Sequence, residues 1–298
     1  MKKGLACALV SYVVWGLLPI FWKQLAAVNS IYVLCSRIIW SLVLAVICLA
    51  FRRDRFSSVR EVLKNRRLCG QLILAGVAVC INWGVYIWCV SAGHIMDSSL
   101  AYYMNPLLAV LLGTVVFREK LRPMQWLSVA TAFAGVVVVV VRYRQMPWLA
   151  LLVGGSFAVY GALKKTAQTD AITASFFETA TLAPFAIILL IVMEKQGISA
   201  SGVLHGWQWL LLPASGVVTT VPLLLYSIGV QNISLTLSGI LMYINPTMQL
   251  LISVFLYQEA FTTNYAILFA FVWTGLVLYM ASAVLHRRNA KGVEALCE

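Results

Sequence analysis

Charged side chains are scarce in this sequence. Of its 298 residues only 11% are Asp, Glu, Lys or Arg, whereas 62% are hydrophobic; about a quarter of the residues of a typical soluble domain are charged. Between Gln196 and Leu285 the single charged side chain is Glu259. Such a stretch cannot form a surface that faces water. The composition therefore excludes a soluble enzyme, a nucleic-acid-binding module and a disordered tail.

Motifs of catalysis and of metal binding are absent as well. The sequence has no H-E-x-x-H, G-x-S-x-G, Walker A or G-x-G-x-x-G segment. Its three aspartates, Asp54, Asp97 and Asp170, do not lie deep in an apolar run, so an intramembrane aspartyl enzyme would lack its pair. The seven cysteines form no C-x-x-C pair, which argues against a metal site and a disulfide framework. We expect no metal, no cofactor and no built-in ATP motor.

Long apolar runs fill the chain instead. A membrane-spanning helix needs about 20 such residues, and polar clusters divide the sequence into ten runs of suitable length. The predicted fold is an all-α integral membrane protein with ten transmembrane helices at 4–22, 31–51, 68–91, 97–117, 124–141, 147–163, 172–193, 207–229, 235–257 and 264–285.

The distribution of basic residues predicts the orientation. The chain has 22 Lys and Arg against 10 Asp and Glu, a net charge of +12, and these charges lie in loops rather than on one face, so they do not indicate nucleic-acid binding. With the N-terminus inside, seventeen basic residues lie on the cytoplasmic side and four on the other, Arg37 being the one left over. The positive-inside rule then places both termini in the cytoplasm.

An internal repeat appears at an offset of 140 residues. Asn105-Pro106, followed by Glu119, recurs as Asn245-Pro246, followed by Glu259, and Tyr86 and Tyr103 fall on Tyr226 and Tyr243. A unit of five helices is odd, so its second copy must face the opposite way across the membrane. The basic residues around Glu119 are indeed missing around Glu259. We predict two inverted five-helix repeats, 1–143 and 144–298, an arrangement found in many secondary transporters.

Two charged residues lie inside predicted spans. Arg37 is seven residues into the second span and Glu178 is seven residues into the seventh, the equivalent helix of the second repeat. A charge at the centre of a spanning helix costs roughly 2.5–3.5 kcal/mol on insertion scales. Arg37 and Glu178 are therefore a candidate solute-binding or gating pair, with a structural ion pair, or an Arg that reaches the interface, as the alternative.

Polar and aromatic residues within the spans are further candidates. Each Asn-Pro pair frees a backbone carbonyl and offers an amide to a ligand, although a simple packing kink explains it equally well. Mid-span aromatic rings could line a cavity for an organic solute, or serve as bulky packing. The candidate wall of a central cavity consists of Trp15, Asn82, Tyr86, Tyr103, Asn105, Tyr226, Tyr243 and Asn245.

Several of these segments resemble a known family. Ser11 to Gly16 with Pro19 and Lys23, Arg37 to Ser41, Asn82 to Trp88, and Ser98 to Leu108 with Glu119 are similar to EamA-type members of the drug/metabolite transporter superfamily, and within it to RarD-type permeases. The resemblance covers essentially the whole chain. It implies a carrier for small organic solutes in the bacterial inner membrane, usually an exporter.

The residues and the resemblance together favour a secondary transporter of small organic metabolites or drugs that works by alternating access. A membrane-embedded enzyme acting on a lipid-like substrate, and a channel or sensor, are the alternatives. The absence of catalytic motifs disfavours the enzyme, and the inverted repeat favours a carrier over a pore. The expected partners are a small-molecule substrate and membrane lipid, without nucleic acid, and with a monomer as the working unit.

Overall fold

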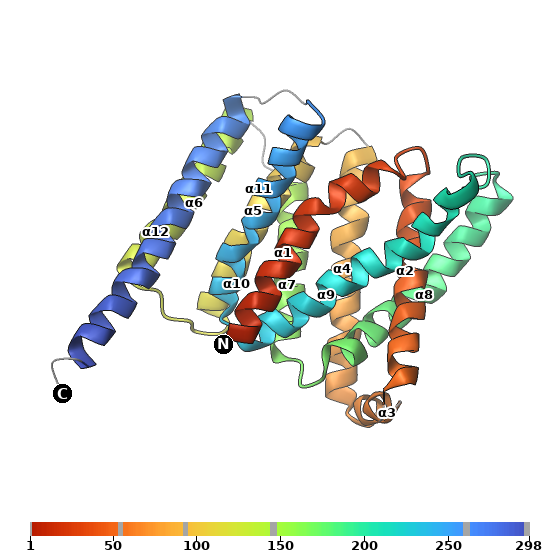
Figure 1. Cartoon of the computed structure of the whole chain (residues 1–298), viewed down its shortest axis with the longest axis horizontal. Coiled ribbons are helices and arrows are strands. Elements are labelled where there is room, and N and C mark those ends of the chain that lie inside the picture. The colour runs from red at the N-terminus through yellow and green to blue at the C-terminus, as the bar shows by residue number, and fades with distance from the viewer. Residues whose placement is uncertain (1, 53–55, 92–94, 144–147, 259–262, 295–298) are drawn as a thin grey trace.

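The computed structural model describes residues 2–52, 56–91, 95–143, 148–258 and 263–294, and the regular secondary structure in these ranges is helical (Figure 1). The first half contains α1 (Lys2–Lys23), α2 (Ser30–Phe51), α3 (Ser57–Lys64), α4 (Arg66–Ser91), α5 (Ile95–Val115) and α6 (Pro123–Tyr143). The second half contains α7 (Trp148–Thr166), α8 (Ala171–Lys195), η1 (Gly206–Leu210), α9 (Leu211–Asn232), α10 (Leu235–Met242), α11 (Ile244–Leu251), η2 (Ile252–Leu256) and α12 (Thr263–Glu294).

Seven helical segments of the described residues are long and apolar enough to cross a membrane. They are Lys2–Lys23, Ser30–Phe51, Arg66–Tyr86, Pro123–Arg142, Ala171–Lys195, Gly206–Asn232 and Leu235–Leu256. Two shorter apolar stretches, Ala101–Val115 and Phe269–Ser282, lie in α5 and α12. The chain is thus an all-helical, multi-pass membrane protein, but the predicted count of ten spanning helices is not confirmed.

The predicted helix 235–257 is divided in the structure. α10 ends at Met242, α11 begins at Ile244, and a π-helical turn, η2, follows α11. Pro246 has no backbone N–H to donate to the preceding turn, and this missing donor interrupts the hydrogen-bond ladder. Pro106, at the equivalent place in the first half, lies inside the continuous helix α5. The predicted loop 52–67 also differs, because it contains the short helix α3.

Local side chains explain where several helices begin. The Asn29 side chain accepts the backbone N–H of Ile31 and Tyr32 at the start of α2. The Asp170 carboxylate does the same for Ile172 and Thr173 at the start of α8. These bonds satisfy amides that have no partner within the helix itself.

Helices of the two halves pack closely against each other. A Cβ atom added to Gly216 of α9 would lie 2.5 Å from the Trp40 carbonyl carbon of α2, and one added to Gly229 would lie 2.9 Å from Cβ of Ala8 in α1. Small residues allow this approach, which is how helices associate in lipid. α6 and α12 lie side by side beyond α11, at the left of Figure 1, and the Ser128 hydroxyl donates to the Gly275 carbonyl between them at 2.6 Å.

Candidate functional site

Arg37 lies in α2 between two tryptophan rings. Its guanidinium carbon is 4.2 Å from the ring centroid of Trp83 in α4 and 5.6 Å from that of Trp22 in α1. Nε is buried and has no hydrogen-bond partner. Among the carboxylate side chains that the structure describes, none lies within 4.0 Å of it. Cation–π contact is therefore the main compensation that the described residues give to this charge.

Polar and aromatic side chains complete the surroundings of Arg37. Tyr86 and Tyr102 act electrostatically on its guanidinium, as do Cys35 and Cys80. The rings of Tyr86 and Tyr102 meet edge to face, with centroids 5.3 Å apart. All of these groups belong to α2, α4 and α5, helices of the first half. We call Arg37, Trp22, Trp83, Tyr86 and Tyr102 the Arg37 cluster.

Glu178 is not the partner of Arg37. Its Oε1 lies 2.6 Å from Nζ of Lys164 in α7, and its Oε2 accepts the Tyr160 hydroxyl at 3.1 Å. The structural Arg37–Glu178 ion pair, one of the alternatives left open by the sequence, is therefore not formed in this structure.

The antiparallel packing of α2 and α8 explains this separation. Leu49 of α2 packs with Ala174 and Phe177 of α8, whereas Cys35 and Ile38 pack with Leu182 and Ala186. Two residues that are each seven positions into their helix therefore lie at different depths along the α2–α8 contact. Equivalent positions in inverted repeats need not meet.

Trp15 and Tyr226 lie in one aromatic cluster with Tyr12, Phe157 and Tyr160. Tyr226 and Tyr160 stack with an interplanar angle of 14°, and the rings of Trp15 and Tyr226 have centroids 5.4 Å apart. Tyr12, Tyr160 and Tyr226 are at most 1% exposed. The cluster joins α1 of the first half to α7 and α9 of the second.

The remaining predicted residues are buried and mostly bonded to the protein. The Tyr243 hydroxyl donates to the Tyr103 carbonyl at 3.3 Å, and the Asn82 amide donates to the Val153 carbonyl at 2.7 Å. Oδ1 of Asn245 accepts the Gln249 amide, whereas Oδ1 of Asn105 is buried without a hydrogen-bond partner. The structure thus distributes the ten predicted site residues over separate clusters. Of these, only the Arg37 cluster, which also holds Tyr86, combines a charge with free hydrogen-bonding capacity.

Glu119 joins the two halves at one end of the bundle. Its carboxylate oxygens accept the backbone N–H of Leu235 at 2.7 Å and of Thr236 at 2.8 Å, the first residues of α10. Lys165 lies 3.7 Å from the same carboxylate and donates to the Ile233 carbonyl at 2.7 Å. We call this arrangement the Glu119 tie. Glu259, its equivalent in the repeat, lies outside the described residues.

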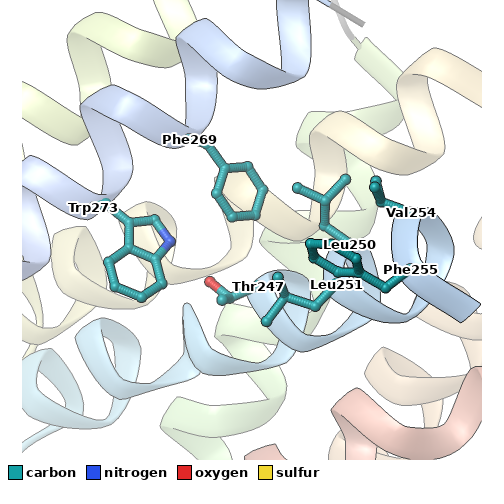
Figure 2. A pocket seen from close by; sticks show the side chains of 7 residues that line it. All are labelled: Thr247, Leu250, Leu251, Val254, Phe255, Phe269 and Trp273. Atoms are coloured by element: carbon teal, nitrogen blue, oxygen red, sulfur yellow. The ribbon is translucent and has the colours of Figure 1, made fainter. Parts of the chain in front are cut away.

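A pocket of about 250 Å³ lies elsewhere, between α11–η2 and α12. Figure 2 shows its lining residues, Thr247, Leu250, Leu251, Val254, Phe255, Phe269 and Trp273. Their side-chain polar groups are the Trp273 indole N–H and the Thr247 hydroxyl, and the hydroxyl donates to the Tyr243 carbonyl. Phe255 is 72% exposed on the outside of the bundle. An apolar crevice of this kind suits a hydrocarbon chain rather than a polar solute.

Sequence reasoning missed Lys164, which was assigned to a loop and counted with the cytoplasmic charges. The structure continues α7 through Thr166, so that Tyr160 and Lys164, four residues apart, lie on one helix face, and Lys164 is 1% exposed. Extending the predicted helix 147–163 by one turn would have revealed this pairing. Trp22 and Trp83 lie in the predicted spans 4–22 and 68–91, but no sequence signal pairs them with Arg37.

The sequence and the fold of this chain are similar to those of known proteins. The EamA-like transporter family model matches residues 2–141 and again 146–281. The chain is 40% identical to an uncharacterized transporter of Vibrio cholerae over 93% of this chain and 92% of the relative. It is 34% identical to Protein RarD of Streptomyces exfoliatus over 97% of this chain and 92% of that protein. A solved crystal structure with 20% identity covers 93% of this chain and 96% of its own, with a TM-score of 0.71, and supports the fold. The chain therefore belongs to the EamA-like transporter family, as a RarD-type permease and membrane transporter.

Proposed function

We propose that this protein is a secondary transporter that exports small organic metabolites or drugs across the bacterial inner membrane by alternating access. Two inverted five-helix repeats, 1–143 and 144–298, provide the moving parts, and the candidate site residues lie between or beside them. Oppositely oriented repeats give inward-open and outward-open states of similar energy around one site.

Residues 140 positions apart support the repeat. Arg118 and Gln258 both have a left-handed backbone, with φ of 53° and 55°. A positive φ is uncommon outside glycine, so its occurrence at two equivalent positions points to the same turn in both halves. Tyr103 and Tyr243, another equivalent pair, contact each other directly.

The observation that carries alternating access is the Glu119 tie. It joins the loop after α5 in the first half to the first turn of α10 in the second half through hydrogen bonds that water can replace. Breaking a few such bonds and separating the helix ends would open this end of the bundle. The aromatic cluster of Tyr12, Phe157, Tyr160 and Tyr226 fills the space between the halves next to it.

α1 relates the tie to the Arg37 cluster. At the start of α1, Gly4 lies against Asn232, close to the tie; Tyr12 contacts Tyr226; and Trp22, near the end, lies beside Arg37. The 18 residue steps from Gly4 to Trp22 correspond to a rise of about 27 Å in a helix. We infer a conformation that is closed at the tie, with the Arg37 cluster on the opposite side of the closure. The charge count assigns the closed end to the cytoplasm.

The orientation has a direct test. We expect both termini in the cytoplasm, so a reporter fused after Glu298 that is active only in the cytoplasm should be active, and one that is active only in the periplasm should not. A periplasmic C-terminus would overturn the assignment of the closed end.

Counterflow in proteoliposomes tests the function itself. Proteoliposomes that contain the purified protein and are loaded with an unlabelled organic solute should accumulate the labelled solute from outside, because a carrier exchanges one molecule for another. A channel would admit solute without stimulation from the opposite side. A lipid-modifying enzyme would change the composition of the vesicle lipids, which mass spectrometry of the same vesicles would detect. Either result would replace the transporter proposal.

A further inference from the structure

We infer that Arg37 binds the carboxylate of an organic anion whose flat apolar part lies against Trp83 and Trp22. The inference deepens the proposed transport function and rests on it, since it names the class of solute that the Arg37 cluster takes. Four observations support it. They are the position of Arg37 within a membrane-spanning helix, its Nε donor without a partner, the aromatic rings around it, and the bonds that already engage the neighbouring carboxylates.

The first observation concerns the cost of the charge. Arg37 lies in a helix that spans the membrane, with Cys35, Ser36 and Ile38 buried on either side of it. A guanidinium remains charged in a protein, so it cannot escape this cost by losing its proton. An intramembrane charge normally pairs with another charge or with backbone carbonyls. A solute anion would supply the counter-charge that the described residues do not.

The second and third observations concern the aromatic contact and the hydrogen-bond donors of the Arg37 guanidinium. The guanidinium carbon lies over the Trp83 ring, 4.2 Å from its centroid. The donors of a guanidinium point outward in its plane, where a carboxylate can receive two parallel hydrogen bonds. Nε–H, one of the donors needed for such a fork, is buried without a partner. The described residues thus leave one donor of this fork unpaired.

The fourth observation is that carboxylates of the neighbouring helix are engaged elsewhere. Glu178 binds Lys164 and Tyr160, as described above. Glu194, toward the other end of α8, accepts the hydroxyls of Tyr32 and Ser199 at 2.8 and 3.1 Å. Neither is free to neutralise Arg37 without breaking a contact of its own.

The aromatic rings favour an organic anion over an inorganic one. Trp22, Trp83, Tyr86 and Tyr102 present apolar faces and edges, which stabilise a planar organic group by stacking and burial but offer little to chloride or phosphate. An aromatic or other flat carboxylate matches this combination of an apolar wall and a single cation.

Binding to purified protein in lipid nanodiscs tests the inference without requiring transport. The probes are benzoate, phenylacetate, 4-hydroxybenzoate and indole-3-acetate, each compared with its own neutral amide at constant chloride. Calorimetric titration gives the affinity, and the unfolding temperature with and without probe gives an independent measure, because a ligand of the folded state raises it. At least one carboxylate should bind about tenfold or more tightly than its amide.

Variants then assign the binding to the cluster. Arg37→Lys keeps the charge but loses the fork, and should weaken the carboxylate about tenfold or more while leaving the amide unchanged. Trp83→Phe weakens the cation–π contact and the apolar wall, and serves as a second variant if Arg37→Lys fails to fold. Arg60→Lys, on the exposed face of α3, and Trp126→Phe, 53% exposed on α6, are the matched controls and should bind as the unaltered protein does.

The outcomes separate this inference from the proposed function. Equal binding of every carboxylate and its amide, unchanged carboxylate binding in both cluster variants, or equal stabilisation by chloride alone would each overturn the anion site. Counterflow of a neutral solute with no carboxylate preference would overturn the anion site and leave the transporter standing. Selective carboxylate binding without any counterflow would support the site and contradict the carrier.

Discussion

Lys164 and Glu178 form an ion pair that is almost completely removed from water. Nζ and Oε1 lie 2.6 Å apart, and the two side chains are 1% and 4% exposed. Tyr160, one helical turn before Lys164, donates to the second carboxylate oxygen. The pair therefore fixes the position of α8 relative to α7, and each partner is the compensation for the other.

Removal of one partner should destabilise the protein strongly. Lys164→Met leaves a buried carboxylate whose one hydrogen-bond donor among the described residues is the Tyr160 hydroxyl. Loss of one member of a buried pair costs about 3–5 kcal/mol. Replacing both residues, Lys164→Met with Glu178→Leu, should cost clearly less than the two single changes added together. The free energy of unfolding in mixed micelles is the measurement.

A surface lysine provides the control for this prediction. Lys64→Met, on the exposed face of α3, should change the free energy of unfolding by at most about 0.5 kcal/mol. Additive effects in the double variant, or a Lys164→Met protein as stable as the Lys64→Met protein, would show that the pair does not tie α7 to α8.

Two glycines should respond oppositely to the same substitution. In Gly216→Ala the new Cβ would lie 2.5 Å from the Trp40 carbonyl carbon and 2.8 Å from the Ser41 nitrogen, both backbone atoms of α2, so α2 and α9 must move apart. Overpacking of this kind costs about 1–3 kcal/mol.

Gly70→Ala is the matched case. Nothing lies within 4 Å of its added Cβ, and Gly70 is exposed within α4. Alanine is the better helix former, by about 0.5–1 kcal/mol, so this variant should be slightly more stable. Unfolding temperatures of the two variants are compared under one condition. Equal shifts in both would contradict the close α2–α9 contact.

The fold class could be predicted from the sequence because a helix that spans lipid requires a long apolar run. Apolar length marks spanning segments, and most predicted spans correspond to helices within a few residues. Breaks within a span were harder to predict. Pro106 and Pro246 occupy equivalent positions, yet only the second divides its helix. Neighbouring helices decide whether a proline is absorbed, and local sequence does not encode them.

The candidate site was predicted only in part for a related reason. Intramembrane charge drew attention to Arg37 and Glu178, but the antiparallel packing of α2 and α8 separates them. Glu178 instead meets Lys164, a residue that lies only 14 positions away but on another helix. The free-energy cost of a charged side chain within a span can be inferred from a sequence. Which residue that side chain pairs with depends on the relative depth and rotation of the packed helices.

The ionisation of Asp170 should make the free energy of unfolding depend on pH in a defined direction. Burial raises the pKa of Asp170, but hydrogen bonds from Thr173 and the charge and hydrogen bond of Arg52 outweigh it and hold this pKa below its usual value. A carboxyl group with a depressed pKa stabilises the folded state above its unfolded pKa, about 3.9, and loses this effect as the pH falls through the folded value. The cation that contacts Asp170 is Arg52, whose Nη1 lies 2.7 Å from Oδ1 of the carboxylate.

The measurement compares unfolding temperatures of the unaltered protein and Asp170→Asn. The difference should be constant between about pH 7 and pH 5 and should shrink below about pH 4. Both side chains are about one third exposed, 31% and 36%, so the difference should be small and should fall with added salt. A difference that grows on acidification would contradict the sign of the pKa shift.

The Glu119 tie predicts which amides of α10 lose protection when it is removed. Glu119 accepts the N–H of Leu235 and Thr236, whereas the next amide, Leu237, donates to the Ser234 hydroxyl at 3.0 Å. Loss of a helix cap costs about 0.5–2 kcal/mol, which corresponds to roughly 2- to 30-fold faster exchange. Hydrogen exchange resolved to single amides should therefore show faster exchange at Leu235 and Thr236 in Glu119→Ala, and less change at Leu237.

The same variant tests whether the tie closes one end of a transporter. If it does, Glu119→Ala should also raise the reactivity of a cysteine placed at Ser234 toward a water-soluble maleimide in a background without other reactive cysteines, because separation of the two halves admits water at this end. Glu61→Ala, which removes an exposed carboxylate from α3, is the control and should alter neither readout. Faster amide exchange without any gain in cysteine reactivity would reduce Glu119 to a helix cap. Unchanged exchange at Leu235 and Thr236 would remove the tie altogether, and with it the contact on which the closed end depends.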